Sequence, residues 1–86
     1  MKKPAKPLTV RQIFGRNLRV TRHLKEISQE ELALRSELSR SYVSEVENGG
    51  RNISIDNMGI LASALGIPLH ILLNPDTYAS VDSFTK

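Results

Sequence analysis

Four stretches of this chain share one pattern: an apolar residue, a Ser or Thr, three further residues, and a second apolar residue. The pattern occurs at Leu8–Ile13, Ile27–Leu32, Leu38–Val43 and Ile53–Met58. A Ser or Thr hydroxyl at an N-cap accepts a hydrogen bond from the first helical turn, and the flanking apolar pair packs together. Gln12 and Glu31 supply the reciprocal partner of a capping box in the first two stretches. The pattern therefore predicts four helix starts.

The spacing of apolar residues extends these starts and adds a fifth helix. It predicts helices over about 10–23, 28–35, 39–47, 55–65 and 69–73. The residues that we expect to be buried are Ile13, Phe14, Leu18, Leu32, Ala33, Val43, Val46, Met58, Leu61, Ala62 and Leu65, with Leu24 and Ile27 closing a loop onto them. Because no stretch alternates like a strand, the predicted fold is all-α, a compact five-helix domain.

The sequence divides into one domain and two flanking segments. Residues 1–8 carry three Lys and two Pro and predict a flexible basic arm, whereas residues 76–86 show no clear period and predict a frayed tail. The folded domain then spans residues 9–75. Its core is small for independent stability, so well-capped helices or dimerisation should help to stabilise it. The chain has no cysteine, which excludes a disulfide framework and a Cys-based metal site.

Charge is distributed unevenly along the chain. Residues 1–25 hold eight Lys or Arg and no acidic residue, whereas residues 26–47 hold six Glu against two Arg. A basic N-terminal third favours a polyanionic partner, although a solvated helix face with a basic tail would give the same count. No apolar run reaches the roughly 20 residues that span a bilayer. We therefore expect no membrane association and a cytoplasmic location.

Several motifs resemble the lambda-repressor/Cro-type (XRE) family of helix-turn-helix regulators. They are Ser-Gln-Glu-Glu-Leu-Ala at 28–33, Ser-Arg-Ser-Tyr-Val at 39–43, Glu-Asn-Gly at 47–49, and Leu-Ala-Ser-Ala-Leu-Gly at 61–66. The resemblance covers about Ile13 to Leu73 and implies a lambda-repressor-like fold with the helix-turn-helix in its second and third helices. Arg-Ser-Tyr-Val-Ser followed by Gly-Arg-Asn-Ile-Ser-Ile is also similar to the controller proteins of restriction–modification systems.

The resemblance implies that residues 39–47 form a recognition helix that enters the major groove of double-stranded DNA. Base reading then falls to its outward residues, Arg40, Ser41, Ser44 and Glu45. Arg40 can donate two hydrogen bonds to guanine. Glu45 has two interpretations, since it could accept from the amino group of cytosine or repel phosphate and so exclude wrong sequences.

Contacts to the DNA backbone are implied for residues on either side of that helix, namely Gln29, Tyr42, Asn48, Arg51 and Asn52. Gln29 lies at a helix N-terminus, where an amide and backbone N–H groups suit a phosphate. The alternative for the last three is a polar loop that needs turn-forming residues. Tyr42 could pack on the preceding helix, place its hydroxyl on a phosphate, or do both.

The resemblance also implies two structural features. Arg22 and Glu47 match a buried ion pair between the first and third helices, and the family pairs its subunits through a region that here contains Leu69, Ile71, Leu72 and Leu73. The alternative is that these four residues only cover the core. One departure concerns the helix-helix turn, where the family has Gly and this chain has Glu37, so we expect a turn of altered shape.

The predicted function is a homodimeric, sequence-specific transcriptional regulator, bacterial or phage-encoded, that binds a pseudo-palindromic operator and is associated with the nucleoid when bound. RNA polymerase is a further possible partner. The alternative is an antitoxin-like module that binds a protein through Tyr78, Val81 and Phe84 and regulates its own synthesis. We expect neither an enzyme nor a cofactor, because His23 and His70 lie apart from any candidate nucleophile.

Overall fold

The structure is a computed structural model in which residues 7–79 are described, and within them it consists of five helices without strands. The helices are α1 (Val10–Leu24), α2 (Gln29–Ser36), α3 (Arg40–Glu47), α4 (Ile55–Leu65) and α5 (Leu69–Leu73). The predicted all-α fold is confirmed, with helix bounds that agree to within about a residue. The expected basic arm lies largely outside the described residues, as does the tail beyond Ala79.

All four predicted N-caps are confirmed. The hydroxyls of Thr9, Ser28, Ser39 and Ser54 each accept a hydrogen bond from the backbone N–H three residues later. The capping box of α1 is complete, because Gln12 Oε1 accepts from the Thr9 N–H at 2.8 Å. The capping box predicted for α2 is only half formed. Its Glu31 carboxylate instead accepts from Arg35 at 2.8 Å, one turn further along the exposed side of the helix.

Four helices end in the same left-handed motif. Gly49 and Gly66 have positive φ angles of 73° and 71°, and Glu26 and Glu37 reach 56° and 58°. At Glu37 the next N–H, from Leu38, donates to Ala33 O at 3.0 Å, which is the hydrogen bond of a Schellman motif. The expectation of an altered turn between α2 and α3 is therefore wrong. Glu37 adopts the left-handed conformation at an energetic cost of about 1 kcal/mol.

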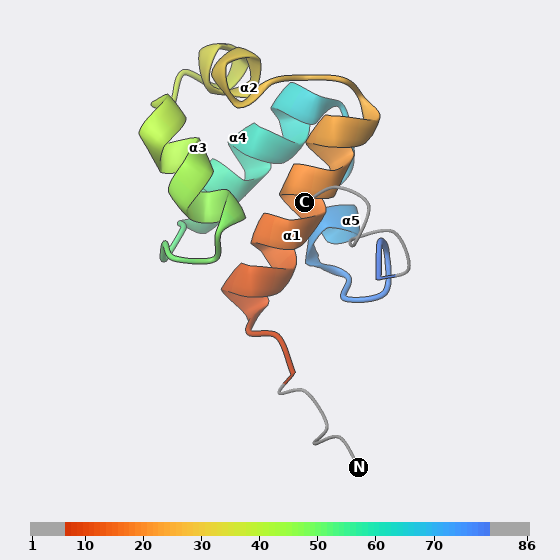
Figure 1. The fold of residues 1–86 in the computed structure, drawn as a ribbon. Helices are drawn as coiled ribbons and strands as arrows, with labels where there is room; N and C mark the ends of the chain where they lie inside the picture. The colour runs from red at the N-terminus through yellow and green to blue at the C-terminus, as the bar shows by residue number, and fades with distance from the viewer. Residues whose placement is uncertain (1–6, 80–86) are drawn as a thin grey trace.

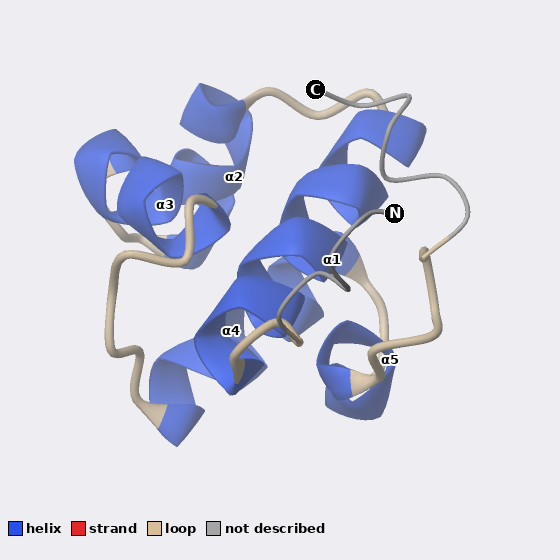
Figure 2. Ribbon diagram, turned by 60° about the horizontal axis from the view of Figure 1, so that its bottom comes forward, coloured by secondary structure: helices blue, strands red, loops and turns tan. Residues whose placement is uncertain are grey.

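α1 lies at the centre of the molecule and packs against α3, α4 and α5, while α2 packs against α3 and α4 (Figures 1 and 2). α2 and α3 thus sit on one side of α1 and α5 on the other. The buried apolar core draws on all five helices: Phe14, Leu18, Val20, Leu32, Ala33, Val43, Val46, Leu61, Ala62, Leu65 and Leu72. Leu24 departs from its prediction. Its side chain is 62% exposed, because α1 continues through it and turns it away from the core.

The segment after α5 is attached to α1 and includes residues 76–79, which were predicted to begin a frayed tail; the rest of that predicted tail lies outside the described residues. Residues 75–79 form turns. Asn17, fully buried on α1, donates through Nδ2 to Leu72 O at 3.0 Å and to Asn74 O at 2.9 Å. Arg16 donates to Pro75 O at 2.7 Å, and the hydroxyls of Thr21 and Tyr78 are hydrogen-bonded at 3.0 Å. One side of α1 therefore fixes the end of α5.

Candidate nucleic-acid interface

α3 has two chemically different faces. Val43 and Val46 are buried to 0% and 2% exposure against the rest of the domain. The four residues predicted to read bases lie on the other side of the helix: Arg40, Ser41 and Glu45, which are exposed, and Ser44, which is half-buried at the margin. These positions share one face because residues three and four apart line up along a helix. The structure thus brings the predicted base-reading residues onto one outward surface.

The inward face of α3 sits unusually close to α1. At Gly15 a Cβ atom would lie 2.3 Å from Val46 O and 2.8 Å from Glu47 O, which is far below van der Waals contact. Only glycine therefore permits this approach of α1 to the C-terminal turn of α3. The sequence showed Gly15 inside a predicted helix, where glycine is unfavourable by about 1 kcal/mol relative to Ala. A glycine inside a predicted helix, despite that penalty, was the one feature of the sequence that could have indicated this close contact.

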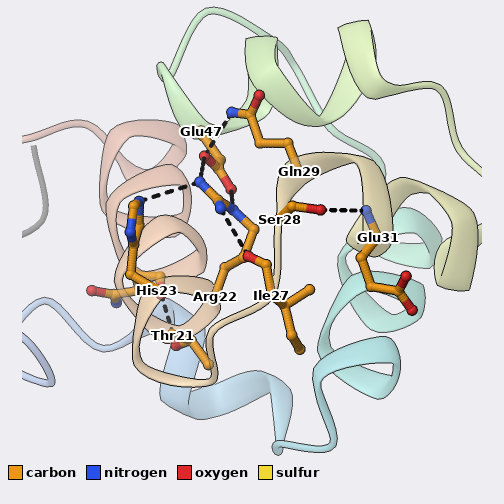
Figure 3. Close-up of polar contacts among 9 residues, drawn as sticks. Thr21, Arg22, His23, Ile27, Ser28, Gln29, Glu31 and Glu47 are labelled. Atoms are coloured by element: carbon orange, nitrogen blue, oxygen red, sulfur yellow. Dashed lines mark hydrogen bonds and ion pairs between the residues drawn. The ribbon is translucent and has the colours of Figure 1, made fainter.

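The same end of α3 is held by an ion pair between Arg22 and Glu47 (Figure 3). Arg22 Nε donates to Glu47 Oε2 at 2.6 Å and Nη2 donates to Oε1 at 2.9 Å, which gives the bidentate geometry of the strongest Arg–carboxylate pairs. The two side chains are only 9% and 2% exposed. Arg22 Nη1 also donates to Ile27 O at 2.9 Å. One guanidinium therefore ties α1 to both α3 and the loop before α2.

Gln29 joins this network from α2. Its Nε2 donates to Glu47 Oε1 at 3.0 Å, and its side chain is half-buried (Figure 3). The amide that was predicted to contact phosphate therefore braces the N-terminus of α2 against the C-terminus of α3. The second N–H of this amide and the backbone N–H at the positive end of the helix dipole remain as donors that suit a phosphate.

A second polar cluster lies on the outward side, where α3 meets the loop that follows it. Arg51 Nη1 donates to Glu45 Oε1 at 2.7 Å, and the Arg51 guanidinium lies over the Tyr42 ring at 4.8 Å from its centroid. The Tyr42 hydroxyl accepts from Asn57 Nδ2 of α4 at 3.0 Å. Tyr42, half-buried, also packs against the core. Arg51, a predicted phosphate contact, thus contacts both Glu45, a predicted base contact, and Tyr42, another predicted phosphate contact.

The loop after α3 keeps its predicted polar residues at the surface. Asn48, Arg51 and Asn52 are all exposed. The loop leaves the helix through Gly49, and Gly50 N donates to Glu45 O at 3.0 Å in a Schellman motif. These backbone bonds fix the path of the loop and so place the backbone of Arg51 beside the last turn of α3.

The apolar residues predicted for a dimer interface differ in burial. Leu72 is fully buried in its own domain, so it offers no surface to a partner and is removed from that prediction. Leu69 and Leu73 are half-buried and pack against the core. Ile71 is half-buried as well. Helix periodicity explains this difference in burial. α5 directs Leu72 into the core, and its other apolar residues lie closer to the surface.

The described residues also bear on the suggested docking segment, on metal binding and on membrane spanning. Tyr78, the first residue of the suggested docking segment, is hydrogen-bonded to α1, and its companions Val81 and Phe84 lie outside the described residues. Within residues 7–79, no group of three or more His, Asp or Glu side chains is placed to hold a metal ion. No helix in that range combines the length and the apolar character needed to cross a membrane.

Comparison with known proteins gives a consistent result. A sequence model of the helix-turn-helix family matches residues 16–72. Control protein C.BamHI of Bacillus amyloliquefaciens is 38% identical over 74 residues, which cover 85% of this chain and 91% of that protein. The crystal structure of the restriction–modification controller protein C.AhdI from Aeromonas hydrophila matches with a TM-score of 0.70 at 48% identity, over 72% of this chain and 94% of the other.

A third similar protein is the hypothetical transcription factor NHTF from Neisseria, whose crystal structure matches with a TM-score of 0.78 at 38% identity. That match covers 91% of this chain and 93% of the other. The family model, the sequence match and the two structural matches each cover most of the described residues. The chain therefore belongs to the lambda-repressor/Cro-type helix-turn-helix family of DNA-binding transcriptional regulators, and its relatives in that family include restriction–modification controller proteins.

Proposed function

We propose that this protein is a homodimeric, sequence-specific regulator of transcription that places α3 in the major groove of a pseudo-palindromic operator. The observation that carries the proposal is the outward face of α3. Arg40 is exposed at its N-terminal end, which is the end that the helix-turn-helix geometry directs at base edges. Behind it, the Gly15 contact and the Arg22–Glu47 pair fix the helix in one orientation.

The roles of the individual contacts follow from their positions. Arg40 donates to guanine, while Ser41 and Ser44 reach base edges or phosphates. Asn48 and Asn52 of the exposed loop, with the N-terminus of α2, bind the DNA backbone and set the register of the helix. The basic N-terminal third adds attraction that does not depend on sequence.

Dimerisation supplies the discrimination that one short recognition helix lacks. Leu69, Ile71 and Leu73 remain as half-buried apolar positions on α5, on the side of the molecule away from α3 (Figure 1). A two-fold dimer formed through α5 would read two half-sites about one DNA turn, roughly 10 base pairs, apart. Such a dimer acts in the cytoplasm beside the nucleoid, and contact with RNA polymerase would allow activation as well as repression.

Selection of bound duplexes from a random DNA pool, followed by footprinting, tests this function. We expect a two-fold symmetric consensus with half-sites about one turn apart and a footprint of matching length. Sedimentation of the complex should give two chains per operator. Equal affinity for all duplexes at physiological salt would contradict the proposal, because sequence-independent binding needs only the basic charge.

A further inference from the structure

The ion pair between Glu45 and Arg51 lies in the middle of the surface that we assign to DNA. Its two side chains are 52% and 48% exposed, so solvent reaches both partners. Exposed pairs of this kind contribute little to folding stability. What distinguishes this pair from other exposed pairs is its position on the surface that we assign to DNA.

Side-chain and backbone contacts hold Arg51 against α3. The guanidinium is held by the Glu45 carboxylate at 2.7 Å and by the Tyr42 ring at 4.8 Å, and Tyr42 is in turn anchored to α4 through Asn57. The backbone contributes as well, since Gly50 N donates to Glu45 O at 3.0 Å. The cation of the loop is thus folded back onto the helix that would enter the groove.

This pairing sets two DNA contacts against each other. Glu45 alone on a groove-facing helix would be repelled by the phosphates, and Arg51 neutralises it. The same bond, made through Nη1 alone, holds the guanidinium beside α3, so the group must leave Glu45 to reach a phosphate further along the backbone. In the water-poor interface with DNA, Arg51 moves to the backbone at least cost where another donor takes its place at the Glu45 carboxylate, because a desolvated charge without a partner is unfavourable. In the major groove the amino group of cytosine is such a donor.

We propose that Glu45 makes the phosphate contact of Arg51 conditional on the base sequence. Where a cytosine amino group faces Glu45, it replaces Arg51 at the carboxylate and releases the guanidinium to a phosphate. On other sequences Arg51 stays on Glu45, and that phosphate contact is not made. The inference rests on the proposed function, and it turns a local ion pair into a determinant of operator specificity.

The chain contains a matched control. Glu31 and Arg35 form a pair at 2.8 Å whose side chains are 44% and 45% exposed, but they lie on α2 and outside the outward face of α3. Glu31→Gln changes the net charge by the same amount as Glu45→Gln. Because Glu31 lies in the first turn of α2, whose N-terminus we place at the DNA backbone, this variant reports the effect of removing one negative charge and releasing one arginine near the DNA but away from α3.

The experiment measures binding of the full chain to its selected operator and to a random duplex of equal length, across a series of salt concentrations. Glu45→Gln should tighten binding to the random duplex more than Glu31→Gln does, and steepen its salt slope by about one unit, because Arg51 is released on every sequence. The ratio of operator to random affinity should fall about tenfold. Selection with Glu45→Gln should lose the preference for cytosine at one position in each half-site.

Arg51→Ala gives an independent readout. It should reduce the salt slope by about one unit on the operator, where a phosphate contact is lost, and by less on the random duplex, where only the neutralisation of Glu45 is lost. An equal loss of slope on both duplexes would overturn the inference, and so would identical behaviour of Glu45→Gln and Glu31→Gln. If the wild-type chain itself shows no preference for any duplex, the proposed function fails and this inference with it. A wild-type preference with either of the overturning results removes the inference alone.

Discussion

Two glutamates on α3, only two positions apart, each form an ion pair with an arginine, yet the two pairs have opposite surroundings. Glu47 and Arg22 are almost completely buried, with side-chain exposures of 2% and 9%. Glu45 and Arg51 are about half exposed, at 52% and 48%. A step of two residues turns a helix by roughly 200°, which carries a carboxylate from the inward face to the outward one.

This difference distinguishes the residues that hold α3 in place from the residues that α3 presents to a ligand. A buried pair cannot lose one partner without leaving an unpaired charge in a medium of low polarity. An exposed pair can exchange its partner for water or a ligand at little cost. We therefore expect inward changes to act on folding and outward changes to act on DNA binding.

The largest effect should come from the inward pair. Glu47→Ala leaves Arg22 and the Gln29 amide without their acceptor and should lower the free energy of unfolding by about 3–5 kcal/mol, measured by urea denaturation. That loss could leave the chain unfolded, so the double variant Arg22→Met with Glu47→Leu is the control. It should recover most of the stability, because no buried charge is left unpaired and the half-buried Gln29 amide can bond to water. A small effect of Glu47→Ala would mean that the pair is not buried in solution.

The second-largest effect on stability should come from the close contact between α1 and α3. Gly15→Ala places a methyl group against Val46 O and should destabilise the domain by about 1–3 kcal/mol through overpacking. Gly59→Ala is the matched control, because no atom lies within 4 Å of the position that its Cβ would occupy. That variant should instead stabilise α4 by about 0.5–1 kcal/mol. Equal melting temperatures for the two variants would contradict the close α1–α3 contact.

On the outward face, Arg40→Ala should leave stability within about 0.5 kcal/mol of wild type. Binding to the operator should weaken by about 1–3 kcal/mol, and the preference for one base pair in each half-site should relax. Fluorescence anisotropy with operator and random duplexes measures both effects. If affinity for the two duplexes falls equally, Arg40 contacts the DNA backbone and does not read a base.

The smallest effect concerns the turn that joins the two helices. Glu37→Gly removes the strain of a left-handed glutamate but adds conformational freedom to the unfolded chain, so we expect a net gain of at most about 1 kcal/mol. Operator affinity should not change, because the turn already has the left-handed geometry. Glu26→Gly, at the equivalent position after α1, should behave alike in thermal melts. A loss of operator affinity on Glu37→Gly would show that this side chain takes part in binding.

The fold was largely predictable because its signals are local. An N-cap hydroxyl bonds to a backbone N–H three residues away, so Thr9, Ser28, Ser39 and Ser54 could be identified without knowledge of the packing. Periodicity identified most of the buried side and hence the outward residues of α3. The family resemblance then supplied the Arg22 and Glu47 positions, which the structure places in contact.

Features that depend on distant contacts were not predictable in the same way. The sequence alone determined where each helix begins, which side of it is apolar, and that Arg40 and Glu45 project from the same helix. Only the tertiary structure decided that Gly15 must lack a side chain, that Leu72 belongs to the core, that Asn17 and Tyr78 fasten the end of α5, and that Arg51 closes on Glu45. The physical reason is that capping and periodicity act within one or two helical turns. Close approach and burial depend instead on how helices distant in the chain are brought together, and the Arg51–Glu45 pair, six residues apart, depends on the path of the loop after α3.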